Sequence, residues 1–241
     1  MDQEGEIVGL AVAFLLAWYH SREIRDTAAK LDVVQQSLST HSLGPFPGFV
    51  DKIAETVRSA ESSLVVACDF PSYGQFDGHG LAIRQAIEDR IGHIGKVELT
   101  FLDPQRREVA RKLQFPEERW TESMKGDARA RAAVVKFLEE GRVDTSNLTY
   151  PLFMKALRDR EETTLQLFAR ADIKQINDDM PLFCWIADDK RAVIVVQDRD
   201  GTENSAFWTT DEHLIAALKG VIRRYREFAQ PSSGVAPNTT R

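Results

Sequence analysis

Two short apolar runs separated by a polar turn constrain the fold of this 241-residue chain more than any other feature. Residues 181–187 are apolar without interruption, and residues 192–196 are apolar and rich in β-branched side chains. A tight polar turn, 188–190, lies between them. Runs that are apolar on both faces are typical of central strands covered on both sides. The pattern therefore predicts a hairpin at the centre of a sheet, with helices on both faces.

A strand–helix–strand unit precedes this hairpin. Residues 64–68 and 97–102 have the composition of buried strands, and the segment 81–91 between them has the spacing of a helix. Two strands joined by a helix run parallel with a right-handed crossover. We expect further helices at 47–62, 150–170 and 210–228 and a short strand at 206–209. The predicted fold class is α/β, a mixed sheet flanked by helices.

The segment between residues 105 and 171 reads as helical, with breaks at Gly126 and at 141–147. It is rich in charge of both signs, including the pairs 106–107 and 111–112. Mixed charge of this kind is usual on helix faces that lie in solvent. We therefore expect these basic residues to be exposed.

An apolar run, 7–19, lies near the N-terminus. The residues before it are acidic and lack the basic region of a secretory signal. A membrane span needs about 20 apolar residues, so this run is short. Trp18 and Tyr19 end it, and Arg22 and Arg25 follow, which would leave the rest of the chain in the cytoplasm. We expect a short membrane anchor. The alternative is a helix buried in the domain or in an oligomer, and a soluble cytoplasmic protein.

Residues 21–39 contain no glycine or proline and carry an apolar seam with alternating spacings of four and three. This is the spacing of a two-heptad coiled coil, and an amphipathic helix lying on the domain fits equally well. The expected organisation is a long N-terminal hydrophobic and amphipathic helix with anchor and stalk in 1–43, one α/β domain in 44–229, and a disordered tail in 230–241. Homo-oligomers would form through the stalk.

Composition restricts the classes of partner and cofactor. The net charge is −6 and the pI near 5.5, whereas a general nucleic-acid binder is usually basic. We therefore expect no nucleic-acid partner. Cys68 and Cys184 each lie inside an apolar run, which indicates buried thiols in a reducing compartment. No Cys-x-x-Cys or Cys/His cluster is present in the sequence, so we expect neither a zinc site nor a cofactor.

The candidate ligand site combines residues that follow the two parallel strands. Asp69 and Asp103 come directly after them, and Tyr73 and His79 lie in the loop after the first. Sites in open α/β sheets form at the carboxyl ends of parallel strands. These side chains would bind a phosphorylated ligand or a metal ion. The alternative is that the aspartates cap turns or helices and His79 lies on the surface.

The order of elements over roughly residues 46–228, together with a degenerate motif, resembles one phospholipase D-like domain. The family motif, His-x-Lys-x-x-x-x-Asp, falls on the apolar hairpin. Pro181 stands at the histidine position, Phe183 at the lysine position, and Asp188 matches the aspartate, which makes Asp188 a further candidate for ligand binding. The sequence contains no second copy of the motif.

The resemblance implies a histidine that attacks phosphorus and a lysine that steadies phosphate charge, and proline and phenylalanine do neither. We therefore predict no catalytic residues of that type. The expected function is ligand sensing or protein interaction by a membrane-associated, catalytically degenerate domain. The alternative is a metal-assisted phosphoester hydrolase that uses Asp69 and Asp103.

Overall fold

The computed structural model describes residues 39–71, 73, 80–180, 182–197 and 204–229. The predicted anchor, nearly all of the stalk, His79, Pro181 and the C-terminal tail lie outside the described residues. Ser42–Arg241 is one compact unit and is described by itself. Within the described part, no helix has the length and apolar character needed to cross a bilayer.

A mixed seven-stranded sheet, with strand order β1-β7-β6-β5-β2-β3-β4, is the centre of the described part. Its strands are β1 (Thr40–Pro45), β2 (Ser63–Ala67), β3 (Lys96–Leu102), β4 (Asp172–Ile176), β5 (Leu182–Ala187), β6 (Arg191–Gln197) and β7 (Asn204–Thr209). Strands β2, β3 and β4 run parallel, whereas β5 is antiparallel to both β2 and β6. The α/β class and the parallel pairing of β2 with β3 are confirmed.

The predicted central hairpin is confirmed as β5 and β6. Between them, Asp188 and Asp189 have φ of 53° and 57°, and the Lys190 amide donates to the carbonyl of Ala187 at 3.0 Å. Two successive residues with positive φ are the mark of the type I′ turn, whose twist matches that of an antiparallel pair. The side chains of Phe183, Trp185 and Val193 are at most 1% exposed, as expected for central strands.

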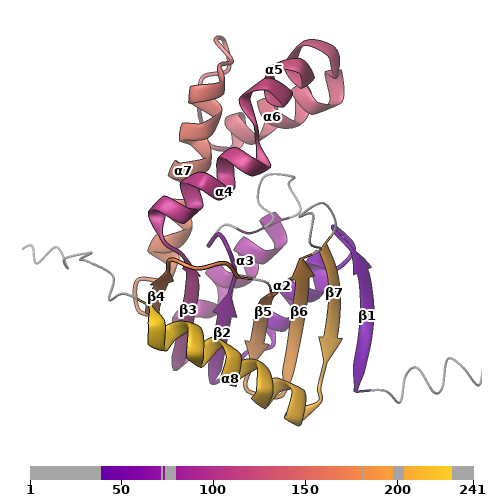
Figure 1. Ribbon diagram of the computed structural model, residues 1–241, viewed down its shortest axis with the longest axis vertical. Helices are drawn as coiled ribbons and strands as arrows, with labels where there is room; N and C mark the ends of the chain where they lie inside the picture. Colours follow the sequence, from indigo (N-terminus) through magenta and orange to yellow (C-terminus); the bar gives the residue numbers. More distant parts are fainter. Residues whose placement is uncertain (1–38, 72, 74–79, 181, 198–203, 230–241) are drawn as a thin grey trace, which may run out of the picture. The chain divides into compact units, whose positions relative to one another are not determined.

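Helices cover both faces of the sheet (Figure 1). On one face lie α2 (Val50–Arg58) and α3 (Gly80–Arg90), followed by a short 3₁₀ turn at Ile91–His93. On the other lies α8 (Glu212–Phe228), which begins where Asp211 accepts a hydrogen bond from the amide of Leu214. The helices bury apolar residues at helical spacing, such as Ile53 and Val57 in α2 and Ile215, Leu218 and Ile222 in α8.

Four helices connect β3 to β4: α4 (Pro104–Gln114), α5 (Glu117–Gly126), α6 (Ala128–Glu140) and α7 (Tyr150–Leu167). The predicted breaks at Gly126 and at 141–147 are confirmed as the ends of α5 and α6. A second hydrophobic cluster around Phe137, Leu138 and Phe153 holds α5, α6 and α7 together. Because α4 begins directly after β3, its first turns lie near the carboxyl ends of the parallel strands, whereas α7 leads to the amino end of β4 (Figure 1).

Candidate functional site

The carboxyl ends of β2 and β3 bring Asp69 and Asp103 to one edge of the sheet. The amide of Leu102 donates to the carbonyl of Asp69 at 3.3 Å, and the amide of Asp103 donates to the carbonyl of Ile176 at 2.8 Å. Because β5 is antiparallel to β2, with Cys184 opposite Ala67, the start of β5 lies at the same edge. The start of β5, which includes Phe183, therefore lies at the edge that carries the two aspartates.

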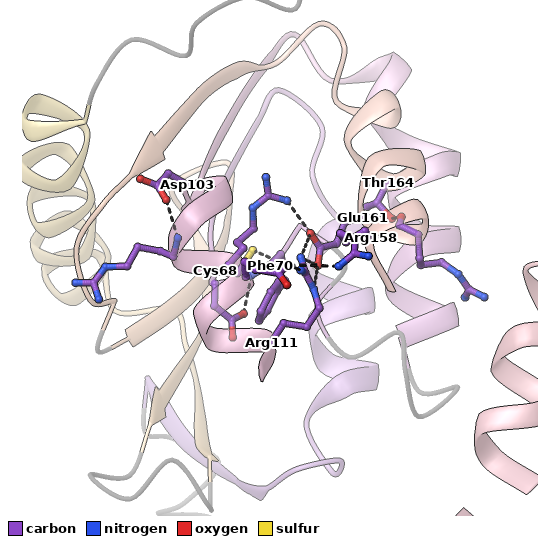
Figure 2. Close-up of polar contacts among 12 residues, drawn as sticks. Cys68, Phe70, Asp103, Arg111, Arg158, Glu161 and Thr164 are labelled. Atoms are coloured by element: carbon purple, nitrogen blue, oxygen red, sulfur yellow. Dashed lines mark hydrogen bonds and ion pairs between the residues drawn. The ribbon is translucent and has the colours of Figure 1, made fainter. Parts of the chain in front are cut away.

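The carboxylate of Asp103 caps α4. It accepts a hydrogen bond from the amide of Arg106 at 2.8 Å, and Pro104 follows it at the first position of the helix (Figure 2). An aspartate at this position satisfies an amide that has no partner within the helix. One oxygen of Asp103 is thus committed to the helix start, as the capping alternative for this residue predicts.

Asp69 is partly buried, and its Oδ1 accepts the amide of Phe70 at 2.7 Å. Desolvation by the surrounding protein raises the pKa of this carboxyl to about 7; the hydrogen bond from Phe70 opposes the shift, and the negative charge of Glu161 adds to it. A carboxyl with a pKa near the working pH exchanges protons readily, so Asp69 has the chemistry of a general acid or base.

The raised pKa predicts that replacing Asp69 with Asn stabilises the protein only at higher pH. The folded carboxyl holds its proton up to about 7 and the unfolded one only to about 3.9, so the native state loses relative stability as pH rises through that window. At about pH 8 we expect Asp69→Asn to raise the free energy of unfolding, on the order of 1–4 kcal/mol. At about pH 4 the gain should vanish. Urea titrations at both pH values measure it, and an equal gain at both would contradict the shift.

Both cysteines remain protonated near neutral pH and therefore lack the thiolate that acts as a nucleophile. The Sγ of Cys68 donates to the carbonyl of Phe70 at 3.0 Å, and burial, with the negative charge of Asp69, raises its pKa well above the usual value. Burial likewise raises the pKa of Cys184 to about 12, against the opposing effect of a hydrogen bond with the Ala67 backbone. Both residues are buried free thiols, as their apolar context predicts.

Tyr73 packs over the position that the family motif gives to lysine. Its ring lies 5.7 Å from the ring of Phe183 and 5.1 Å from that of Trp185, centroid to centroid. Phe183 and Trp185 are two residues apart on β5 and therefore point to the same face of the sheet. Tyr73 is thus part of an aromatic layer over the start of β5 and is itself half-buried.

Asp188 lies at the opposite end of the sheet and is not brought together with Asp69 and Asp103. Its carboxylate accepts hydrogen bonds from the amides of Glu61, Ser62 and Ser63 and from the hydroxyl of Ser62, all at 2.8–2.9 Å. Burial raises its pKa, but these four hydrogen bonds outweigh burial and hold the pKa well below the usual range. The residue ties the β5–β6 turn to the loop before β2.

A buried ionic cluster, which sequence analysis missed, stands beside the aspartates. This Arg–Glu cluster consists of Arg107 and Arg111 on α4 and Glu161 on α7, which are 8%, 4% and 3% exposed. Arg107 Nη1 donates to Glu161 Oε2 at 2.7 Å. Arg111 donates to both oxygens of Glu161, from Nη2 at 2.8 and 2.9 Å and from Nε at 3.2 Å (Figure 2). The expectation that the basic pairs of this region lie in solvent is wrong for Arg107 and Arg111.

Aromatic rings and three further charged side chains complete the surroundings of the Arg–Glu cluster. The guanidinium of Arg107 lies 5.1 Å from the ring centroid of Phe101, and that of Arg111 lies 5.8 Å from that of Phe70. At the outer side, Glu108 accepts from Arg111 at 2.5 Å and from Arg158 at 3.5 Å. Lys112 Nζ also lies 3.7 Å from Glu108 Oε1, so three arginines and one lysine face two glutamates, a formal charge of +2.

Among the described residues, two of the clefts lie away from this edge. One, of about 390 Å³, lies between α3, α6 and α7 and is lined by Arg84, Arg142 and Arg160, among others. The other, of about 340 Å³, lies between α8 and the starts of β2 and β3. Neither includes Asp69 or Asp103. In the part of the chain that the structure describes, no three His, Cys, Asp or Glu side chains are grouped to hold a metal ion.

No protein-family model matches the sequence, and no curated protein matches it. Among solved structures, the chain is similar to Nuc, a phospholipase D family member from Salmonella typhimurium: identity is 10%, coverage 81% of this chain and 99% of that one, and the TM-score 0.41. It is similar to NucT from Helicobacter pylori at 11% identity, covering 79% and 96%, with a TM-score of 0.43. It is also similar to TrmBL2, an archaeal chromatin protein with a novel mode of DNA binding, at 13% identity, covering 95% and 71%, with a TM-score of 0.40.

Proposed function

We propose that this chain is a phospholipase D-like binding domain that does not cleave phosphodiesters and acts in ligand sensing or protein interaction. One observation carries the proposal: the side chain at the motif's lysine position, Phe183, is 1% exposed and lies under the ring of Tyr73. A phosphate group has no cation to meet at that place. Pro181, at the histidine position, has no nucleophilic side chain.

The chemistry of the neighbouring residues supports the same proposal. Cleavage of a phosphodiester through a covalent intermediate needs an activated nucleophile and a positive group aimed at the phosphate oxygens. The Cys68 thiol keeps its proton, and one oxygen of Asp103 is held by the start of α4. The buried arginines of the Arg–Glu cluster also stand at this edge, and a positive group is needed to bind an anionic ligand as much as to cleave it.

The full chain should show no turnover of bis(4-nitrophenyl) phosphate, single-stranded DNA or phosphatidylcholine vesicles, with or without divalent cations. Release of nitrophenolate, oligonucleotide length and free choline measure the three reactions. Metal-independent turnover that survives repurification and is lost in Asp69→Asn would overturn the proposal. Metal-dependent turnover lost in the same variant would favour the alternative, a hydrolase that uses Asp69 and Asp103.

We also propose that the N-terminal segment 7–19 attaches the domain to a membrane and that the stalk joins two or more copies. The apolar run, its closing aromatic pair and the basic residues that follow support attachment with the domain in the cytoplasm. The full chain should sediment with membranes and resist a high-salt wash, whereas a chain lacking residues 1–21 should remain in the supernatant. A full chain that is monomeric in buffer without detergent would show that 7–19 packs against protein instead.

A further inference from the structure

Within the described residues, only one nitrogen of the Arg107 guanidinium, Nη1, donates a hydrogen bond. Its Nη1 is bound to Glu161, whereas neither Nε nor Nη2 meets an acceptor there. Nε is shielded from solvent, and the whole side chain is only 10% exposed. The cluster's other arginine differs in this respect, because Nε, Nη1 and Nη2 of Arg111 all donate to glutamate oxygens.

A buried N–H without an acceptor costs the folded state about 1–3 kcal/mol. Such a donor in the folded protein therefore indicates an acceptor supplied by a ligand. Nε and Nη2 form the side edge of the guanidinium, where two parallel N–H groups match the two oxygens of a carboxylate or phosphate. The edge is held in place, because Glu161 fixes Nη1 and the ring of Phe101 lies 5.1 Å from the guanidinium carbon. A preorganised fork of this kind loses little side-chain entropy when it binds an anion.

The position and charge of Arg107 also suit an incoming anion. Its amide donates to the carbonyl of Asp103 at 2.9 Å, which sets it in the first turns of α4, directly after the carboxyl end of β3. Ligands of α/β sheets bind at that end of the strands. Three arginines and one lysine face two glutamates in the surroundings, and this excess of positive charge favours an incoming anion.

We infer that the Nε–Nη2 edge of Arg107 is a binding site for an oxyanion, the carboxylate or phosphate group of a small ligand. The inference rests on the proposed function, since it names the chemical class of the ligand that the domain binds. Glu161 acts as a positioning residue, which holds the guanidinium with its free edge away from the carboxylate. Arg111 donates hydrogen bonds to both oxygens of Glu161, so the Nε–Nη2 edge of Arg107 remains available for a ligand.

The test compares Arg107→Lys with the full wild-type chain. The substituted lysine keeps a positive charge for Glu161 but has no side edge with two parallel donors. Calorimetric titration with inorganic phosphate and with acetate, at ionic strength matched by chloride, gives the affinity. We expect a roughly 10- to 100-fold loss of oxyanion affinity in Arg107→Lys, as for loss of hydrogen bonds to a charged group. The matched control is Arg158→Lys, a partly exposed arginine of the same surroundings, which should stay within about twofold of wild type.

Equal affinity of wild type and Arg107→Lys, or no binding beyond that of chloride, would overturn the inference. Melting curves without added anion establish that both variants are folded at the titration temperature. A preference for phosphate over acetate assigns a phosphoryl group to the ligand, and the reverse assigns a carboxylate. If the chain binds the oxyanion but also cleaves phosphodiesters, the proposed function is refuted and this inference stands. If the chain neither binds the oxyanion nor cleaves phosphodiesters, this inference is refuted and the absence of cleavage stands.

Discussion

Replacing Glu161 with alanine is expected to lower the free energy of unfolding by about 3–5 kcal/mol. The variant leaves two guanidinium groups, 8% and 4% exposed as whole residues, without the carboxylate that accepts four of their hydrogen bonds. A buried charge without an ionic or hydrogen-bond partner strongly destabilises the folded state. Urea denaturation of the full chain, followed by circular dichroism, measures the loss.

Glu108→Ala is the matched control for this prediction. Glu108 is bound to Arg111 and Arg158, but its side chain is 36% exposed, so water replaces much of what the substitution removes. Exposed ion pairs contribute about 1 kcal/mol or less. Equal losses in the two variants would contradict the view that Glu161 is the buried centre of the cluster.

Placing a lysine at this position, Phe183→Lys, is expected to unfold the domain and to create no activity. The substitution removes a fully buried ring that packs against Tyr73 and places an ammonium group among apolar side chains. Loss of a buried phenylalanine costs about 3–5 kcal/mol, and an unpaired buried charge adds to that. The sum approaches the whole stability of an ordinary domain. Thermal melting and the solubility of the expressed protein measure the effect.

Phe183→Leu separates the loss of the ring from the presence of a charge. It keeps an apolar side chain and should cost only about 1–2 kcal/mol. A stable Phe183→Lys protein, with a melting temperature close to that of Phe183→Leu, would mean that the start of β5 opens to solvent. The proposal that this position belongs to the core would then fail.

The centre of the sheet was predictable because both faces of β5 and β6 are buried. Strands of that kind are apolar throughout, and the turn between them carries polar residues that tolerate positive φ. Strands β1 and β4 escaped prediction for the opposite reason. In β4, Asp172–Ile176, only Ile176 is buried, so the segment has neither a continuous apolar run nor a clear alternation. Strand β1 includes Gly44 and Pro45, which read as a break rather than as a strand.

Only those site residues whose place follows from their position directly after a strand were predictable. Asp69 and Asp103 reach one edge because each follows a parallel strand, and this rule needs no knowledge of contacts. Arg107 and Arg111 did not stand out among the other charges of 105–171, because the residue that buries them, Glu161, is 50 or more positions away. Their spacing of four on one helix face was the single local signal. Asp188 fitted the motif by spacing, yet its hydrogen bonds come from the first residue of β2 and the loop before it.

Binding without cleavage is tested most directly by phosphorus NMR of the full chain with a phosphodiester, followed over many hours. Line broadening of the phosphodiester signal on addition of protein, absent with Arg107→Lys, reports binding at the proposed edge. We expect that broadening with no loss of integrated intensity and no new signal. A phosphomonoester signal that grows with time, and that fails to grow with Asp69→Asn, would contradict a domain that binds an oxyanion and leaves it intact.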